Sequence, residues 1–274
     1  MRNINFDELK AIELEILKKI HNICENENLR YSLIGGTLLG AVRHKGFIPW
    51  DDDIDIVMPR KDYETFIDYC VHNSTELPFY IVSSKTNKNY GYLFAKACAK
   101  GTTIEEVHGN RYQCNLGVYV DIFPVDGLGV SFEEAKKTYA KTTFKRELLV
   151  ASNWKEFFRS KTRAIYFEPI RYAFYLMSRL VNVNKLINKI DEICKKKDFD
   201  SSKYVGVVCG VYRRKEIMKK DVFAEYEKIE FEGLKVNALK NSKEYLSNIY
   251  GDYMKLPPKE KQFSHHMFKA YYMD

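Results

Sequence analysis

The sequence predicts an α+β fold in which a mixed β-sheet is flanked by helices and followed by a mainly helical C-terminal part. Over the first 130 residues, short apolar runs typical of strands alternate with longer runs that have an apolar residue every three or four positions. Beyond Ser131, a good helix N-cap, helical spacing dominates to about residue 197. We therefore expect a core of residues 1–130 and a C-terminal region of residues 131–274, with a soft boundary between them.

The individual elements follow from the same periodicities. A first helix is predicted near 6–27, a second from Thr37 to His44 and a third from Arg60 to about Val71. In the C-terminal region, Asn153 and Pro169 are expected to break the helices. Strands are predicted near 30–34, 52–58, 79–83, 92–99, 117–123, 204–212 and 228–237.

The composition indicates a globular protein with a sizeable core. The chain has 274 residues, of which 45% are hydrophobic. Its six cysteines lie at irregular spacings without a CxxC pair, which favours reduced thiols over a disulfide framework or a zinc site. We find no leader pattern and no apolar run of membrane-spanning length in the sequence. We therefore expect a cytoplasmic protein, with peripheral contact at the inner membrane face as an open alternative.

The most informative segment is WDDDIDI, at residues 50–56. Side chains alternate along a strand, so Asp51, Asp53 and Asp55 are expected on one face and Asp52 on the other. Carboxylates crowded on one face raise one another's pKa unless a divalent cation neutralises them, and their hard oxygens suit Mg²⁺ or Mn²⁺. The segment therefore predicts a metal site.

A solvated turn and a calcium loop both fit the aspartates less well. Most aspartate runs are solvated turns, but the apolar neighbours of this run indicate a half-buried strand. A calcium loop of the EF-hand type would accept Asp51, Asp53 and Asp55 as its first three ligands, but the chain lacks the glycine and the final glutamate that such a loop needs. Ile56 stands where that loop needs glycine, and Asp62 stands where it needs a bidentate glutamate.

A further carboxylate comes from GVYVDIFPVDG, at residues 117–127. Alternation places Val118, Val120 and Ile122 on one face of a strand and Asp121 on the other. Taken alone, Asp121 can also be a turn or capping aspartate. If its strand neighbours the first one, Asp53, Asp55 and Asp121 converge.

A second set of residues is suited to phosphate. A glycine pair lets the backbone approach phosphates, and the start of the following helix can bind an anion. Basic residues between these glycines and the aspartates would face the same ligand, although each alone is more often a surface residue. The candidate phosphate ligands are Gly35, Gly36, Thr37, Arg43, His44 and Lys96.

The segment from Tyr31 to Pro59, together with VDIFPVDG at 120–127, resembles the LicD family of phosphotransferases. This family, related to fukutin, belongs to the polymerase-β-type nucleotidyltransferase superfamily. There a glycine pair starts a helix, an Asp-x-Asp strand follows, and a third acidic residue lies on a later strand. Residues 93–106 and 250–266 also resemble LicD segments. The resemblance implies a nucleotidyltransferase-like catalytic core in residues 1–130 and a region of residues 131–274 that completes the donor and acceptor site.

The resemblance further implies a reaction. A phospho-alcohol group, most often phosphocholine from CDP-choline, would move to a hydroxyl of a cell-surface glycan, such as lipopolysaccharide, or of a teichoic-acid precursor, with release of CMP. Asp53 and Asp55 would hold one or two Mg²⁺ or Mn²⁺ ions, and Asp121 would complete the metal shell and help to deprotonate the acceptor. The candidate substrate contacts are Trp50, Asp51, Tyr250, Tyr253, His265 and His266.

The basic charge is concentrated in one stretch. Between Lys136 and Lys197 there are sixteen Lys and Arg against five Asp and Glu, interleaved with aromatic residues. Such a stretch can lie on an anionic membrane, hold a polyanionic acceptor or bind nucleic acid. Equally, it can be a solvated helical face whose aromatic residues belong to the core.

Three rival functions stay open at this point. A nucleotidyltransferase acting on a protein, an RNA or a small molecule would release pyrophosphate instead of CMP. A nucleic-acid-binding module would bind polyanions with steep salt dependence and would not need Asp53 or Asp55. An inactive scaffold of the same fold is disfavoured because all three candidate metal ligands are present. We infer no obligate protein partner.

Overall fold

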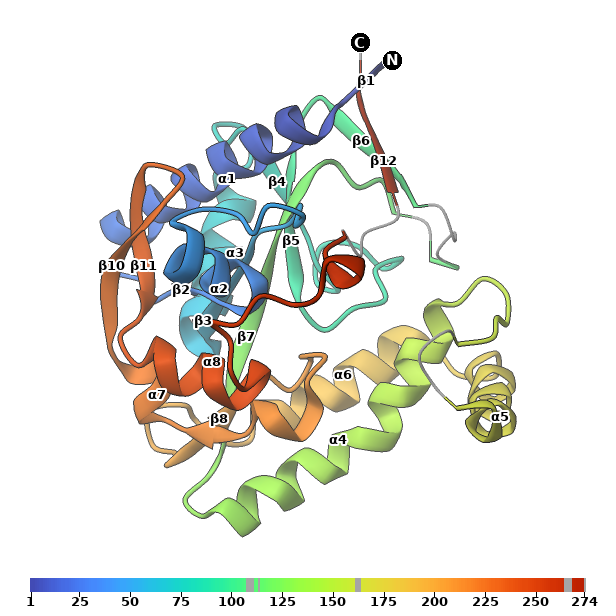
Figure 1. Ribbon diagram of the computed structural model, residues 1–274. Helices are drawn as coiled ribbons and strands as arrows, with labels where there is room; N and C mark the ends of the chain where they lie inside the picture. The colour runs from blue at the N-terminus through green and yellow to red at the C-terminus, as the bar shows by residue number, and fades with distance from the viewer. Residues whose placement is uncertain (107–110, 113, 161–163, 264–267, 274) are drawn as a thin grey trace.

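The computed structural model describes residues 1–106, 111–112, 114–160, 164–263 and 268–273. Helices and strands are mixed along the chain, which confirms the α+β class (Figure 1). The helices are α1 (Phe6–Asn26), α2 (Gly35–His44), α3 (Arg60–His72), α4 (Phe132–Asn153), α5 (Glu168–Ser178), α6 (Val183–Cys194), α7 (Asp221–Ala224) and α8 (Ser242–Tyr250). The strands are β1 (Arg2–Asn3), β2 (Ser32–Leu33), β3 (Asp55–Pro59), β4 (Phe79–Val82), β5 (Ala95–Ala99), β6 (Thr102–Glu106), β7 (Tyr119–Gly129), β8 (Tyr204–Gly206), β9 (Met218–Lys219), β10 (Tyr226–Phe231), β11 (Leu234–Leu239) and β12 (Phe268–Tyr272).

The main sheet has the strand order β10-β11-β2-β3-β7-β5-β4, and β8 pairs with β7 beside it. The sheet is mixed, because β3 and β7 run parallel while β5 and β7 run antiparallel. The central strands are buried, and α1 and α3 pack against them. The long strand β7 is the common neighbour of β3 and β5, so it brings distant segments of the sequence together.

Local signals explain most of the helices. Asn5 and Glu8 form a reciprocal capping box that starts α1, and the apolar face predicted for this helix is buried. Ser131 caps α4, as expected. Pro169 lies in the first turn of α5, where a proline is tolerated because its missing N–H would have no helical partner. Within the described residues, none of the helices is both long and apolar enough to cross a bilayer.

The C-terminal region is rich in helices and also supplies strands to the main sheet. β10 and β11 form a hairpin whose turn residues, Glu232 and Gly233, both have positive φ, as a tight two-residue hairpin turn requires. β11 then pairs with β2. The expected boundary near residue 130 stays a prediction. A separate three-stranded sheet, β1-β12-β6, brings the two ends of the chain together (Figure 1).

Several strand predictions were wrong in detail. The aspartate strand was expected over 52–58 and begins only at Asp55. The reason is local: the backbone N–H of Asp55 donates to the Thr37 hydroxyl at 2.8 Å, and the Asp51 N–H closes a turn onto the Ile48 carbonyl. The residues 51–54 therefore form an irregular segment. The strand expected over 204–212 ends at Gly206, and the one expected over 92–99 begins at Ala95.

Candidate active site

Three charged side chains lie in one row across the centre of the sheet. Asp55 on β3 is paired with Asp121 on β7, and Asp121 is paired with Lys96 on β5. Directly paired residues point to the same face of a sheet, so these three share a face. The next row, Ile56 and Ile122, is fully buried on the opposite face. The predicted convergence of the two aspartate strands is therefore present.

Lys96 is the immediate partner of Asp121. Its Nζ lies 2.6 Å from Asp121 Oδ1 and 3.4 Å from the centre of the Tyr119 ring, and its side chain is only 6% exposed. A lysine can be buried in this way when a carboxylate and an aromatic face surround the ammonium. Predicted as a phosphate ligand, Lys96 serves in this structure as the cation beside Asp121.

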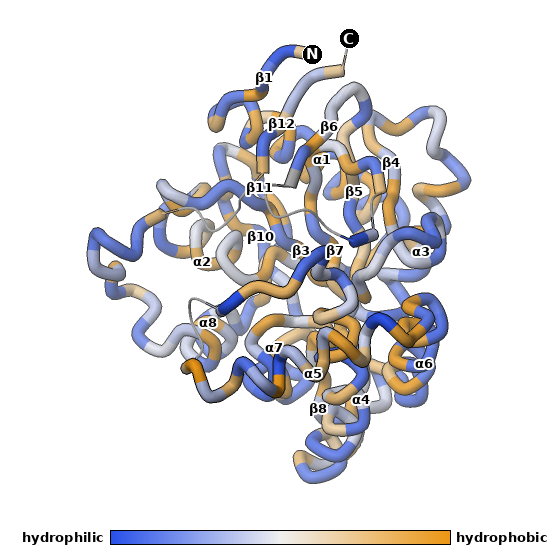
Figure 2. The backbone as a smooth tube through the Cα atoms, turned by 90° about the vertical axis from the view of Figure 1, so that its right-hand side faces the viewer, coloured by the Kyte–Doolittle hydropathy of each residue, from blue (hydrophilic) through white to orange (hydrophobic). Residues whose placement is uncertain are grey.

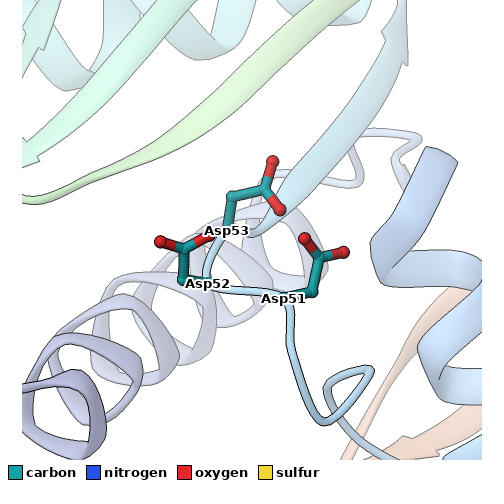
Figure 3. A group of neighbouring side chains, drawn as sticks. All are labelled: Asp51, Asp52 and Asp53. Atoms are coloured by element: carbon teal, nitrogen blue, oxygen red, sulfur yellow. The ribbon is translucent and has the colours of Figure 1, made fainter. Parts of the chain in front are cut away.

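The segment before β3 holds a cluster of three carboxylates, Asp51, Asp52 and Asp53 (Figure 3). One potential ligand oxygen from each of them lies within 4.8 Å of the others. The expectation that Asp52 points away from Asp51 and Asp53 was wrong. Strict alternation holds only on a strand, and this segment is irregular, so consecutive side chains can turn toward one another.

The start of α2 lies against these carboxylates. A Cβ atom on Gly35 would lie 3.3 Å from Asp55 Oδ2, and one on Gly36 would lie 2.7 Å from Asp51 Oδ2. Gly35 also has a φ of +59°, a conformation that glycine adopts without strain. The glycine pair therefore lets two carboxylates approach the helix start. Thr37 supports the same loop, because its hydroxyl donates to the Asp53 carbonyl at 3.3 Å and accepts from the Asp55 N–H.

The electrostatics of the cluster favour a cation. Burial, followed by the nearby charges of Asp53 and Asp121, raises the pKa of Asp55 well above its usual range. Lys96 partly opposes this shift. Because carboxylates repel one another, a divalent cation held among them would stabilise their ionised forms.

Glu13 of α1 is an acidic neighbour that the sequence analysis missed. It is 2% exposed, and its Oε2 has no hydrogen-bond partner among the described residues. Burial is the main cause that raises its pKa, and the charges of Asp53 and Asp52 follow. The signal in the sequence is a carboxylate on the apolar face of a helix, between Leu9 and Ile16.

Arg43 and His44, at the end of α2, contact the C-terminal segment and each other. Arg43 Nη1 donates to the Tyr253 carbonyl and its Nε donates to His44 Nε2, both at 2.9 Å. The guanidinium thus fixes the loop after α8 beside α2. Their expected role as phosphate ligands stays a prediction.

The remaining candidate substrate contacts differ in position. The Tyr250 hydroxyl accepts a 3.0 Å hydrogen bond from Tyr212 and would lie 3.9 Å from a Cβ on Gly35, so it is close to the aspartates. Burial raises its pKa. Trp50 is half-buried against the core. His265 and His266 lie outside the described residues.

A pocket of about 490 Å³ opens between α4, the segment 91–94 and the segment 209–213. Its walls include Tyr92, Phe94 and Trp154, and the cations Arg146 and Arg213. None of the aspartates is among its lining residues, but Phe94 in its wall lies 5.2 Å from Lys96 Nζ, the partner of Asp121. Sequence reasoning missed this pocket because its walls come from three distant segments.

The second aspartate of VDIFPVDG has a structural role. Asp126 is 1% exposed and accepts hydrogen bonds of 2.7 and 3.1 Å from the Arg60 guanidinium. Arg60 also donates to Asp191 of α6 at 2.9 Å. This network joins α3, β7 and α6. Asp121, five residues earlier on β7, instead lies beside Asp55.

Comparisons with known proteins agree with this geometry. Residues 28–171 match the family model described as LicD/FKTN/FKRP, nucleotidyltransferase domain. The chain is 32% identical over 275 residues to the lipopolysaccharide cholinephosphotransferase LicD of Haemophilus influenzae, an alignment that covers 99% of each chain. A shorter segment of 48 residues is 44% identical to the ribitol 5-phosphate transferase FKRP of human, covering 18% of this chain and 10% of that protein.

Proposed function

This chain belongs to the LicD family, as a LicD-like phosphotransferase, and we propose that it transfers phosphocholine from CDP-choline to a hydroxyl of a cell-surface glycan or teichoic-acid precursor. Its relatives named above transfer choline phosphate and ribitol 5-phosphate, so transfer of a phospho-alcohol group is the common chemistry. The choice of choline rests on the relative that aligns over the whole chain.

The convergence of carboxylates is the observation that carries this proposal. Asp55 and Asp121 face the same side of the sheet, and the charges of Asp53 and Asp51 act on Asp55. Asp51, Asp52 and Asp53 form a cluster of their own (Figure 3). Phosphoryl transfer needs charge neutralisation and positioning more than covalent chemistry. A cluster of carboxylates at the start of a helix meets that need when it holds a divalent cation.

The donor set fits Mg²⁺ or Mn²⁺. Its side chains offer only carboxylate oxygens, the ligands that hard divalent cations prefer. Asp53, Asp55 and Asp121 are the residues we assign to the metal. Asp51 and Asp52 form one cluster with Asp53, so they are further candidate ligands. Such an ion supplies charge neutralisation to the donor phosphates.

The other residues have roles in binding and proton transfer. We assign to Asp121 the task of accepting the proton of the acceptor hydroxyl. Lys96 Nζ donates a 2.6 Å hydrogen bond to the same carboxylate. We assign the donor phosphates to the start of α2, where backbone N–H groups can bind an anion. The Asp55 and Asp51 carboxylates lie against Gly35 and Gly36 there, so a cation would have to neutralise them first. We assign the 490 Å³ pocket to the organic part of a substrate, because aromatic walls suit a choline headgroup or a sugar ring.

The first test is thermal stability with Mg²⁺ or Mn²⁺ and a panel of CDP-alcohols. A ligand that binds the native state stabilises it by about 2.7 kcal/mol at a hundredfold excess over Kd. We expect a metal-dependent rise in Tm with CDP-choline. A rise only with CDP-ethanolamine, CDP-ribitol or CDP-glycerol would change the headgroup. A rise only with nucleoside triphosphates would favour nucleotidyl transfer.

The second test is product analysis with matched variants. Asp53→Asn and Asp121→Asn are expected to abolish turnover and the metal-dependent rise in Tm while the protein stays folded. Asp68→Asn, an exposed aspartate on α3, is the control and should behave as the wild type. Release of CMP supports the proposed reaction, and release of pyrophosphate would replace it with nucleotidyl transfer.

A further inference from the structure

The outer surface of α5 and of the short turn before it is apolar. From residue 164 to 177, all of which the structure describes, every exposed side chain is apolar or aromatic. Exposed fractions in this region reach 71% at Tyr166 and 89% at Leu180. We call the following set the α5 face: Ile165, Tyr166, Phe167, Ile170, Tyr172, Leu176, Met177 and Leu180. Figure 2 shows this segment, coloured by the hydropathy of its residues, at the label α5.

The charges of this segment are on the inside. Glu168 and Arg171 pair with each other at 2.6 Å, and their side chains are 15% and 7% exposed. Arg171 also donates to the Phe158 carbonyl at 3.0 Å and lies 4.8 Å from the centre of the Trp154 ring. An ordinary surface helix has the opposite arrangement, with polar residues outside and apolar residues inside. The exposed surface of α5 is therefore apolar, and its aromatic residues are not all part of the core, as the alternative in the sequence analysis would require.

The helix is also accessible. It packs against α4, where Phe174 and Phe144 lie 5.4 Å apart, and Figure 1 shows it at the edge of the molecule, beyond the main sheet. A single projecting helix presents a convex ridge. A flat or deformable partner can meet such a ridge, whereas a second protein copy would bury only a small area on one eleven-residue helix.

The stretch of chain that contains α5 is basic in sequence, with sixteen Lys and Arg against five Asp and Glu between Lys136 and Lys197. Two of these cations, Arg146 and Arg171, are buried. Lys155 and Arg159, in the segment that leads to α5, are exposed, with Glu156 as an exposed acid between them. Apolar and aromatic side chains flanked by cations are the composition of helices that lie in the interface of an anionic bilayer.

We propose that the α5 face docks on an anionic lipid bilayer, with its apolar side chains in the interfacial layer and Lys155 and Arg159 near the headgroups. Tyrosine suits this position, because its ring is apolar and its hydroxyl can stay hydrated. The docking is peripheral, since α5 is far shorter than a membrane-spanning helix.

Docking in this way would bring the pocket close to the bilayer. Trp154 and Phe158 line the pocket, and both rings lie against Arg171 of α5, at 4.8 and 5.2 Å. An acceptor anchored in lipid would then approach the pocket from the side of α5. This consequence rests on the proposed function, whereas the docking itself does not.

The test is flotation of the whole protein, without nucleotide or metal, with vesicles of phosphatidylcholine alone and of phosphatidylcholine mixed with phosphatidylglycerol. We expect binding to the mixed vesicles and binding at least about tenfold weaker to phosphatidylcholine alone. The variant Ile170→Glu/Leu176→Glu should weaken binding to the mixed vesicles at least about tenfold, because two charges enter the interface. Val71→Glu, at an exposed apolar position on α3, is the matched control and should bind as the wild type.

Three results would overturn the proposal. The first is that the wild type binds neither kind of vesicle. The second is that the double variant binds as strongly as the wild type. The third is that light scattering shows a dimer of the wild type and a monomer of the double variant, which would assign the α5 face to a second copy. The thermal unfolding of the double variant, followed in parallel, verifies that it is folded. Because no nucleotide is present, failure here leaves the proposed reaction untouched.

Discussion

Lys96 Nζ lies 2.6 Å from Asp121 Oδ1, and the two residues are directly paired across β5 and β7. The side chains are 6% and 16% exposed. At this burial, removing one partner leaves the other charge poorly solvated, which costs about 3–5 kcal/mol for a fully buried pair. Replacing either residue of the pair should therefore change the stability of the sheet as well as the charge of the row that Asp55, Asp121 and Lys96 form.

A double-mutant cycle on this pair gives the first prediction. Lys96→Met and Asp121→Asn should each lower the free energy of unfolding, measured by urea denaturation without metal, by about 2–3 kcal/mol. The double variant should lose clearly less than the sum, because neither charge then remains alone. All three variants should lack turnover. Additive losses would show that the ion pair contributes no coupling.

Gly36→Ala is expected to separate folding from activity. Alanine is favoured over glycine in a helix by about 1 kcal/mol, so the helix itself should not suffer. The new Cβ, however, would lie 2.7 Å from Asp51 Oδ2 and would displace that carboxylate. We expect an unchanged or higher Tm without ligand and a loss of the metal-dependent rise in Tm. Gly233→Asn is the control for the metal response. A Cβ there meets nothing within 4 Å, but the φ of +77° disfavours a side chain, so we expect a lower Tm with an unchanged metal-dependent rise. A normal metal response in Gly36→Ala would remove Asp51 from the site.

Asp126→Asn should lose stability, as Asp121→Asn does, but keep the metal response that Asp121→Asn loses. Asp126 is fully enclosed and holds the Arg60 guanidinium with two hydrogen bonds. Its loss should lower the free energy of unfolding by about 3 kcal/mol, because the largely buried Arg60 guanidinium then keeps only one of its two carboxylate partners, Asp191. The metal-dependent rise in Tm should persist at a temperature where the variant is folded. A variant with wild-type stability and no metal response would contradict this assignment.

Glu216 predicts a specific pH dependence of stability. Burial is the largest cause that raises its pKa, to about 8, and a backbone hydrogen bond from Tyr212 and the charge of Arg146 oppose the shift. Because the folded-state pKa lies above the unfolded one, the folded protein holds a proton that the unfolded chain loses. This contribution is complete below about pH 4.5 and is lost as the pH rises through about 8.

Glu216→Gln should remove that dependence. Between the two values the difference in unfolding free energy between wild type and variant should change by about 1.4 kcal/mol for each pH unit, against the wild type as pH rises. Urea denaturation across this range measures it, and the comparison cancels the other titrating groups. A constant difference between the two proteins would show that Glu216 has an ordinary pKa in the fold.

The sequence alone determined the elements whose signals are local. The apolar period of α1, the cap at Ser131 and the alternation of residues 117–123 report backbone geometry directly, and the structure has α1, α4 and β7 at these places. The two hydrophobic–Asp–hydrophobic strands also predicted that their aspartates would converge if the strands were neighbours. The structure has β3 and β7 as parallel neighbours, with Asp55 beside Asp121. The family likeness added the reaction class.

Only the tertiary structure decided how these elements complete the site. Asp52 turns toward Asp51 and Asp53 because residues 51–54 are irregular, and no periodicity reports that. Glu13 enters the acidic cluster through helix packing, and Lys96 meets Asp121 through strand register. The α5 face reads as an ordinary amphipathic segment in sequence, since periodicity shows that two faces differ and not which one is covered. Local patterns fix the backbone, whereas contacts between distant segments fix which side chains meet.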